Sequence, residues 1–288
     1  MSSLSSPRGL GRALAALGVA SILSIALAAC QPDTSGSNDG STASEYVTDG
    51  KLTIATGEPA FEPWVVGDAP ESGEGFEAAV AYAVAEKLGF AAEDVVWVRT
   101  GFDEVIAPGP KTFDFNIQQF TITDERAAAV DFSSPYYETA QVVITTEGSA
   151  ASSASSLSEL ASLRIGAAVG TTSFDAVEAQ IAPRSGALAF DSNEDAVLAL
   201  TSGTVDAIVV DLPTAFYLTA VELDGGIIVG QLPRGDGKSG ENFGLLLPKD
   251  SALTEAVTAA VDELREDGTL GALAEQWLNN AGNVPLLG

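Results

Sequence analysis

The sequence predicts an α/β protein in which helices cover largely parallel sheets. Segments with the two-residue alternation of strands are followed, along most of the chain, by segments with the period of helices. The 288 residues are many for one hydrophobic core, and no internal repeat divides them. Hydrophobic residues make up 46% of the chain, which is enough to fill more than one core.

Hydrophobic period, capping residues, glycine and proline locate the individual elements. Ser192 is expected to cap one helix, Gly89 to end another, and the Pro-Gly-Pro sequence at 108–110 to stop a short one. The expected strands are 51–56, 95–98, 113–117, a short one ending in 133–137, 141–146, 163–168, 188–190, 205–210, 227–232 and 243–247. The expected helices are 75–88 and 251–265 (both amphipathic), 102–106, a short alanine-rich one opened by Arg126, 157–161, 174–181, 192–200 and 270–278.

Composition excludes several classes of function. Acidic residues outnumber basic ones by 40 to 13, so nucleic acid and anionic membrane surfaces would be repelled. The chain has no histidine, which excludes Ser-His-Asp and Cys-His catalysis in their usual form and most zinc sites. It has one cysteine, so it forms no internal disulfide. We expect no metal and no cofactor.

The first 29 residues are predicted to be a targeting segment. Arg8 and Arg12 precede an apolar run at 13–28, which ends in Leu-Ala-Ala-Cys at Cys30. This ending is similar to a bacterial lipobox, which implies cleavage before Cys30 and lipid attachment to its sulfur. A transmembrane anchor and a plain signal peptide with an incidental cysteine are the alternatives. Residues 30–45 are small and polar, as in a flexible tether.

One stretch, 116–137, combines features of a ligand site. A strand runs into the polar turn 118–123, and Arg126 follows at the start of a short helix. The ends of strands are where α/β folds bind ligands. The planar guanidinium group of arginine suits a carboxylate, because two parallel charge-assisted hydrogen bonds form at once. Arg126 and Thr121 are therefore candidate ligand-binding residues.

This stretch resembles the T-x-x-R-x-x-x-(V/I)-x-F-(S/T)-x-P-Y-Y block of the family-3 extracellular solute-binding proteins, and D-G-T-x-x-x-L-x-x-x-W at 267–277 is similar to their C-terminal signature. The resemblance implies a type II periplasmic-binding-protein-like fold, in which two crossover strands join two lobes around a ligand cleft. Lobe one would comprise 46–139 plus 232–288, and lobe two 140–231.

The resemblance also assigns roles to residues outside this stretch. Phe61 would pack on the ligand, the alternative being a core residue, which is what we expect of Trp64. The Gly-Thr-Thr turn containing Thr171 and Thr172 would bind the ligand carboxylate with its free N–H groups and hydroxyls. Asp211 would bind the ammonium group, the alternative being a helix N-cap.

The side-chain pocket is expected to contain Glu58, Gln118, Gln119 and Ala168. Family members usually have small or hydroxyl residues where the two glutamines stand, and a longer helix where this chain has 102–112. An acidic ligand side chain would lack a partner beside Glu58, which favours a polar or cationic amino acid.

The resemblance to this family and to a lipobox therefore implies a monomeric lipoprotein at the extracytoplasmic face of a bacterial cell membrane. It would bind a free amino acid and hand it to the membrane subunits of an ABC permease. The alternatives are a dehydratase-like enzyme on the same fold, a binder of an amino-acid derivative, and the sensory module of a receptor.

Overall fold

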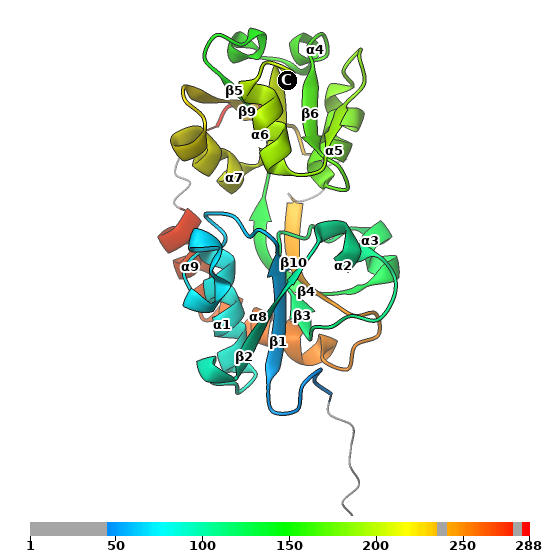
Figure 1. The fold of residues 1–288 in the computed structure, drawn as a ribbon, viewed down its shortest axis with the longest axis vertical. Helices are drawn as coiled ribbons and strands as arrows, with labels where there is room; N and C mark the ends of the chain where they lie inside the picture. Colours follow the sequence, from blue (N-terminus) through cyan, green and yellow to red (C-terminus); the bar gives the residue numbers. More distant parts are fainter. Residues whose placement is uncertain (1–44, 235–240, 279–283) are drawn as a thin grey trace, which may run out of the picture. The chain divides into compact units, whose positions relative to one another are not determined.

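The computed structural model describes residues 45–234, 241–278 and 284–288, which form two five-stranded sheets covered by helices (Figure 1). The predicted targeting segment, Cys30 and nearly all of the predicted tether lie outside the described residues. Within those described ranges, no helix is both long enough and apolar enough to cross a membrane.

The first sheet and the helices packed on it are here called lobe one. Its strand order is β2-β1-β3-β10-β4. β1 pairs in parallel with β2 and β3, whereas β10 pairs antiparallel with β3 and β4, so the expectation of a largely parallel sheet was wrong. The bounds are β1 (Leu52–Gly57), β2 (Val95–Thr100), β3 (Phe115–Asn116), β4 (Asp131–Thr139) and β10 (Glu241–Leu247).

The second sheet and its helices are here called lobe two. Its strand order is β7-β6-β8-β5-β9, and it is also mixed, because β5 runs antiparallel to both of its neighbours. The chain passes from the first sheet to the second at Ala140 and returns between Gln231 and Glu241. The bounds are β5 (Gln141–Thr146), β6 (Ile165–Ala168), β7 (Leu188–Phe190), β8 (Ala207–Asp211) and β9 (Gly226–Gln231).

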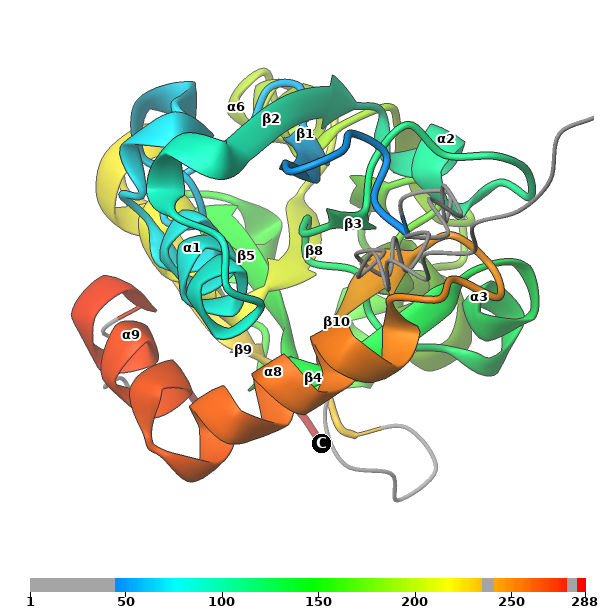
Figure 2. The same cartoon turned by 90° about the horizontal axis from the view of Figure 1, so that it is seen from below.

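Helices cover both faces of the first sheet. One face carries the larger core with α1 (Phe76–Lys87), α8 (Thr254–Glu266) and α9 (Thr269–Leu278), and Figure 2 shows α8 crossing β4. The other face packs against α2 (Phe102–Ile106) and the segment around α3 (Asp124–Ala129). The predicted apolar side of α1 faces this core, and the buried face is wider than expected because Glu77, Ala78, Ala81 and Ala85 are buried too.

The helices of lobe two are shorter, and they also pack on both faces of their sheet. They are α4 (Leu157–Leu160), α5 (Thr172–Ala176), α6 (Asn193–Thr201) and α7 (Leu212–Tyr217), with single π-helical turns after α5 and α7. Ser192 accepts a hydrogen bond from the N–H of Asp195, so the predicted helix cap is confirmed. Gly89 has the left-handed φ of 86° expected of a residue that ends a helix.

Two local features differ from the sequence-based expectations. β4 continues through the Ser-Ser-Pro-Tyr-Tyr sequence to Thr139 as one nine-residue strand, because β10 pairs along it. The last residues, 284–288, dock on β9 although they were assigned to lobe one. Leu287 is 1% exposed in the core of lobe two, and its N–H donates to the carbonyl of Gln231 at 2.9 Å. β9 is an edge strand with free hydrogen-bonding groups, and Gly230 leaves room for Leu287.

Candidate ligand-binding site

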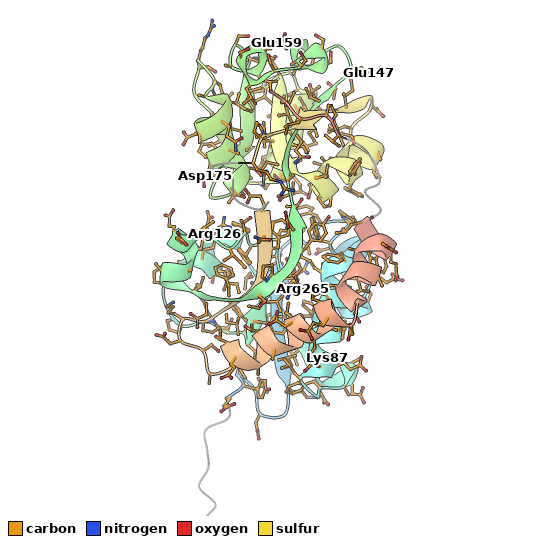
Figure 3. The ribbon with its side chains drawn as sticks, turned by 180° about the vertical axis from the view of Figure 1, so that it is seen from behind. Lys87, Arg126, Glu147, Glu159, Asp175 and Arg265 are labelled. Atoms are coloured by element: carbon orange, nitrogen blue, oxygen red, sulfur yellow. The ribbon has the colours of Figure 1, made fainter. Side chains whose placement is uncertain are left out.

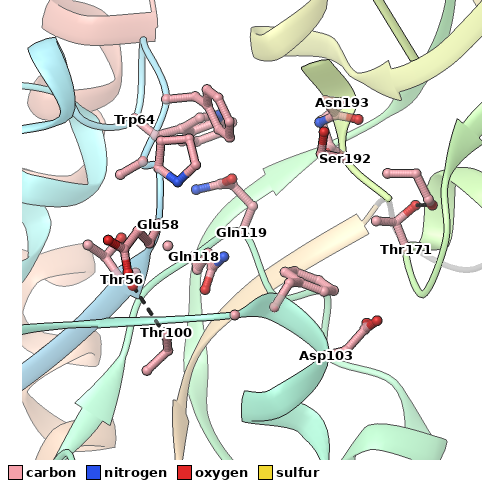
Figure 4. A pocket seen from close by; sticks show the side chains of 18 of the residues that line it. Thr56, Glu58, Trp64, Thr100, Asp103, Gln118, Gln119, Thr171, Ser192 and Asn193 are labelled. Carbon is pink, nitrogen blue, oxygen red and sulfur yellow. Dashed lines mark hydrogen bonds between the residues drawn. The ribbon is translucent and has the colours of Figure 1, made fainter. Parts of the chain in front are cut away.

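A cavity of about 380 Å³ lies between the two lobes and is lined by both (Figure 4). Its volume is within the range of small-molecule sites. All ten residues that the sequence nominated for ligand binding line it: Glu58, Phe61, Gln118, Gln119, Thr121, Arg126, Ala168, Thr171, Thr172 and Asp211. The structure therefore brings together residues that are up to 153 positions apart in the sequence.

Arg126 is a buried cation that makes no ion pair with any of the described residues. It lies within α3, whose start is capped by Thr123, and its side chain is directed to the junction of the lobes (Figure 3). The guanidinium group donates to the carbonyl of Thr121 at 2.8 Å and to that of Gly170, in lobe two, at 2.9 Å. In the described part of the chain, no carboxylate lies within 4.0 Å of it. Burial lowers the pKa of Arg126. Its remaining N–H groups can therefore serve a ligand carboxylate.

Asp211 ends β8 and stands before α7, but its carboxylate makes no hydrogen bond to the helix N–H groups. The structure therefore disfavours the alternative of a capping role. Burial, together with the neighbouring Glu241 carboxylate, raises the pKa of Asp211 to about 8, although Gln141 and Arg126 act in the opposite direction. A carboxylate whose pKa is raised this far lacks sufficient positive partners, and an ammonium group would supply one.

Gln141 orients this carboxylate and was missed in the sequence. Its side chain is 5% exposed at the start of β5, where the chain crosses between the lobes. Its amide nitrogen donates to Asp211 at 2.9 Å and to the hydroxyl of Thr172 at 3.4 Å, and its amide oxygen accepts from Ser173 at 2.6 Å. A lone amide before the apolar run 142–144 was the available signal.

Thr171 and Thr172, the two threonines of the predicted anion site, make different hydrogen bonds. The hydroxyl of Thr171 donates to the carbonyl of Ala168 at 2.6 Å and accepts from the N–H of Phe174, so it caps α5. The hydroxyl of Thr172 lies 3.2 Å from that of Thr121 across the two lobes. Thr172 is therefore the member of the pair that faces lobe one.

Aromatic side chains form part of the cavity wall. Phe61 is partly buried at the cavity. Trp64 also lines the cavity, but it is 1% exposed and packs in the core of lobe one as expected. Phe102, missed in the sequence, also lines the cavity. Its ring stacks on that of Phe120 with centroids 4.6 Å apart, and the guanidinium carbon of Arg126 lies 5.5 Å from its centre. An aromatic residue at the first position of a helix that follows a strand was the signal for it.

Hydrogen bonds to Glu77 stabilise the turn that contains Gln118 and Gln119. Glu77 is fully buried and accepts hydrogen bonds from the backbone N–H of Gln119 at 2.8 Å, from the Gln119 amide and from the Tyr136 hydroxyl. Burial raises the pKa of Glu77 to about 7. Gln119 has the unusual φ of 49°, which these bonds stabilise. Its amide nitrogen is thus engaged by Glu77, whereas the buried amide oxygen of Gln118 has no hydrogen-bond partner among the described residues.

The charges around the cavity are unequal. Four carboxylates line it against a single guanidinium group, that of Arg126, and the carboxylates belong to Glu58, Asp103, Asp191 and Asp211. Asp103 comes from α2 in lobe one and lies against Gly170 of lobe two, where a Cβ atom would collide with its carboxylate. The lining of the cavity therefore carries more acidic than basic groups.

Two mixed sheets with a charged cavity between the lobes define a binding protein of the type II periplasmic class. Residues 52–280 match the bacterial extracellular solute-binding proteins, family 3, and the chain belongs to that family. The chain is 28% identical over 256 residues to a probable histidine-binding protein of Campylobacter jejuni, a match that covers 87% of this chain and 93% of the relative.

Solved structures agree with this assignment. An ancestral arginine-binding protein bound to glutamine is 34% identical and superposes with a TM-score of 0.66, over 80% of this chain and 98% of that one. An ancestral amino acid-binding protein described as a precursor of cyclohexadienyl dehydratase is 28% identical, with a TM-score of 0.66 over 80% and 95% of the two chains.

Proposed function

We propose that this protein captures a free amino acid with a cationic side chain between its lobes and delivers it to an ABC permease. The α-carboxylate would bind Arg126 with the help of Thr121 and Thr172, and the α-ammonium group would bind Asp211. The observation that carries this proposal is the excess of carboxylates in the cavity. After a zwitterion has met Arg126 and Asp211, the carboxylates of Glu58, Asp103 and Asp191 remain for a positive side chain.

Ligand-dependent closure follows from the same charges. Arg126 belongs to lobe one and Asp211 to lobe two, and neither has an ion-pair partner within 4.0 Å in the described residues. Burying such groups without a counter-charge costs on the order of several kcal/mol. An amino acid supplies both counter-charges at once, so it binds the closed arrangement more tightly than the open one and shifts the population towards it.

A panel of free amino acids tests the ligand class. A ligand whose free concentration is 1,000 times its Kd adds about 4 kcal/mol to the free energy of unfolding. We expect L-arginine and L-lysine to raise the melting temperature most, L-glutamine less, and L-glutamate not at all. Glu58→Gln should weaken arginine binding by up to about 1 kcal/mol and leave glutamine binding unchanged. The exposed Glu71, outside the cavity, provides the matched control Glu71→Gln.

A preference for glutamate or aspartate in this panel would contradict the proposed charge complementarity. Mass spectrometry of the recovered ligand separates binding from catalysis. Unaltered ligand at one equivalent supports a binding protein, and a chemically changed product supports a dehydratase-like enzyme instead.

The anchor is the other part of the proposal. The lipobox-like sequence ending at Cys30 supports lipid attachment, which would hold the protein at the outer face of the cell membrane as a monomer. We expect Cys30→Ser to release the protein from the membrane fraction and to prevent incorporation of labelled fatty acid. Continued membrane association with no fatty acid in the wild-type protein would instead favour an uncleaved transmembrane anchor.

A further inference from the structure

A hydrogen bond between protein groups links the lobes beside the cavity. The indole N–H of Trp64, in lobe one, donates to the hydroxyl of Thr214, in lobe two, at 3.0 Å. Trp64 is 1% exposed and Thr214 is 9% exposed, so the bond is shielded from water. We propose that Trp64 and Thr214 form a latch that positions the two lobes for ligand binding and slows ligand release. This inference rests on the proposed function, because it concerns the lifetime of the ligand complex.

The Trp64 side of the latch is rigid. Its ring makes edge-on contacts with Phe76, Tyr137 and Phe243 at centroid distances of 6.1, 6.1 and 5.7 Å. Its carbonyl accepts from the N–H of Glu77 at 2.9 Å, in the first turn of α1. The backbone also passes so close to Gly75 that a Cβ atom there would collide with the Trp64 carbonyl. The indole N–H is therefore presented at the surface of lobe one in a fixed position.

The Thr214 side is joined directly to the proposed ammonium site. Thr214 is the third residue of α7, and Asp211 immediately precedes that helix. On the opposite side, the N–H of Trp64 bonds to the carbonyl of Phe61, which lines the cavity, at 3.0 Å. The latch thus connects the turn that contains Phe61 to the helix that follows Asp211. Formation of this bond fixes the distance between two walls of the cavity.

The latch differs from the other hydrogen bonds between the lobes. The Arg126–Gly170 bond and the Thr121–Thr172 bond use groups that we assign to the ligand. Trp64 lines the cavity and Thr214 does not, but the indole N–H of Trp64 has its acceptor within the protein, so this hydrogen bond uses no group that we assign to the ligand. The latch therefore stabilises the closed arrangement independently of ligand contacts. Because the bond forms only when the lobes are together, it lengthens the lifetime of the closed ligand complex.

The latch is expected to affect the rate of ligand dissociation more than the rate of association. Release of a ligand from between two lobes requires the lobes to separate, and separation breaks the latch. Loss of the latch should therefore accelerate dissociation, while association, which begins from separated lobes, stays nearly unchanged. Loss of a shielded hydrogen bond of this kind should increase the dissociation rate roughly tenfold.

Stopped-flow measurement with L-arginine tests this. Trp64→Phe removes the donor and keeps an aromatic ring, and Thr214→Val removes the hydroxyl at nearly constant volume. We expect each to increase the dissociation rate about tenfold. The double variant should be no faster than the faster single variant, because both remove the same bond. Thr214→Ser keeps the hydroxyl and should behave as the wild type does.

Trp97 offers a matched control within lobe one, because its indole N–H donates to the Tyr82 hydroxyl at 3.2 Å. Trp97→Phe should leave the dissociation rate unchanged. Wild-type dissociation rates in both Thr214→Val and the double variant, or additive effects in the double variant, would overturn the latch.

If the wild type binds no amino acid of the panel, the proposed function fails. Small-angle X-ray scattering of the ligand-free protein then tests the latch separately. Thr214→Val should then have a larger radius of gyration than the wild type and Thr214→Ser, and equal radii would overturn it.

Discussion

Replacing Arg126 with alanine is expected to weaken amino-acid binding by about 2–5 kcal/mol, which is roughly 30- to 4,000-fold in Kd. The variant removes the cation proposed to bind the α-carboxylate and the bond to Gly170 that spans the lobes. Isothermal titration calorimetry with L-arginine measures the loss, and circular dichroism establishes whether the fold is retained.

Two further arginine variants sharpen this experiment. Arg126→Lys keeps the charge but loses the planar fork, so we expect an intermediate affinity. Arg265→Ala removes an arginine that lies outside the cavity, on α8, and should bind as the wild type does. An Arg126→Ala protein that is folded and retains wild-type affinity would refute the carboxylate assignment.

The replacement Asp211→Asn is expected to weaken binding by about 2–3 kcal/mol at pH 8. Asparagine keeps the size and the contact with Gln141 but cannot neutralise an ammonium group. The exposed Asp224 of lobe two provides the matched control Asp224→Asn. An arginine analogue without the α-amino group should bind the wild type and Asp211→Asn equally, and a persisting difference would show that Asp211 acts on another part of the ligand.

The pH dependence of this effect has a defined sign. In the ligand-free fold the pKa of Asp211 is raised to about 8, and a bound ammonium group would lower it. Binding below pH 8 therefore releases a proton, so wild-type affinity should rise between pH 6 and pH 8, by at most tenfold per pH unit. Asp211→Asn should lack this rise, and calorimetry in buffers of different ionisation enthalpy measures the proton directly.

The pH dependence of the free energy of unfolding provides a second check. Its slope is opposite to that expected for the affinity. The ligand-free fold holds its proton on Asp211 up to about pH 8, whereas the unfolded chain loses it near pH 4. Between these values the folded state binds more protons, so the contribution of Asp211 to stability falls as pH rises, by up to about 1.4 kcal/mol per pH unit. Denaturant unfolding of the wild type and Asp211→Asn at several pH values should show this difference, and parallel curves would contradict it.

Features with a local signal were the ones that could be predicted from the sequence. β5 and β7 have the predicted bounds because apolar β-branched or aromatic runs end at polar or glycine residues. The cavity residues were found through a motif around Arg126 and through the position of Asp211 at a strand end. Both signals lie within a few residues of the side chain concerned.

Features that depend on packing between distant segments could not be predicted. The docking of Leu287 on β9 requires both an unpaired strand edge and the space beside Gly230, and neither is visible in the tail itself. In the sequence Gln141 is only one residue of a predicted strand. Its role depends on its hydrogen bonds with Asp211 and Ser173, which are distant in the sequence. Trp64 was correctly expected in the core, but its hydrogen bond to a residue 150 positions away has no local signal.

The central claim is that one amino acid bridges Arg126 of lobe one and Asp211 of lobe two. A crystal structure of the protein grown with L-arginine tests it most directly. We expect an α-carboxylate oxygen within about 3 Å of the Arg126 guanidinium group and the α-nitrogen within about 3 Å of the Asp211 carboxylate. An amino acid held by one lobe alone, or with its ammonium group away from Asp211, would contradict the account.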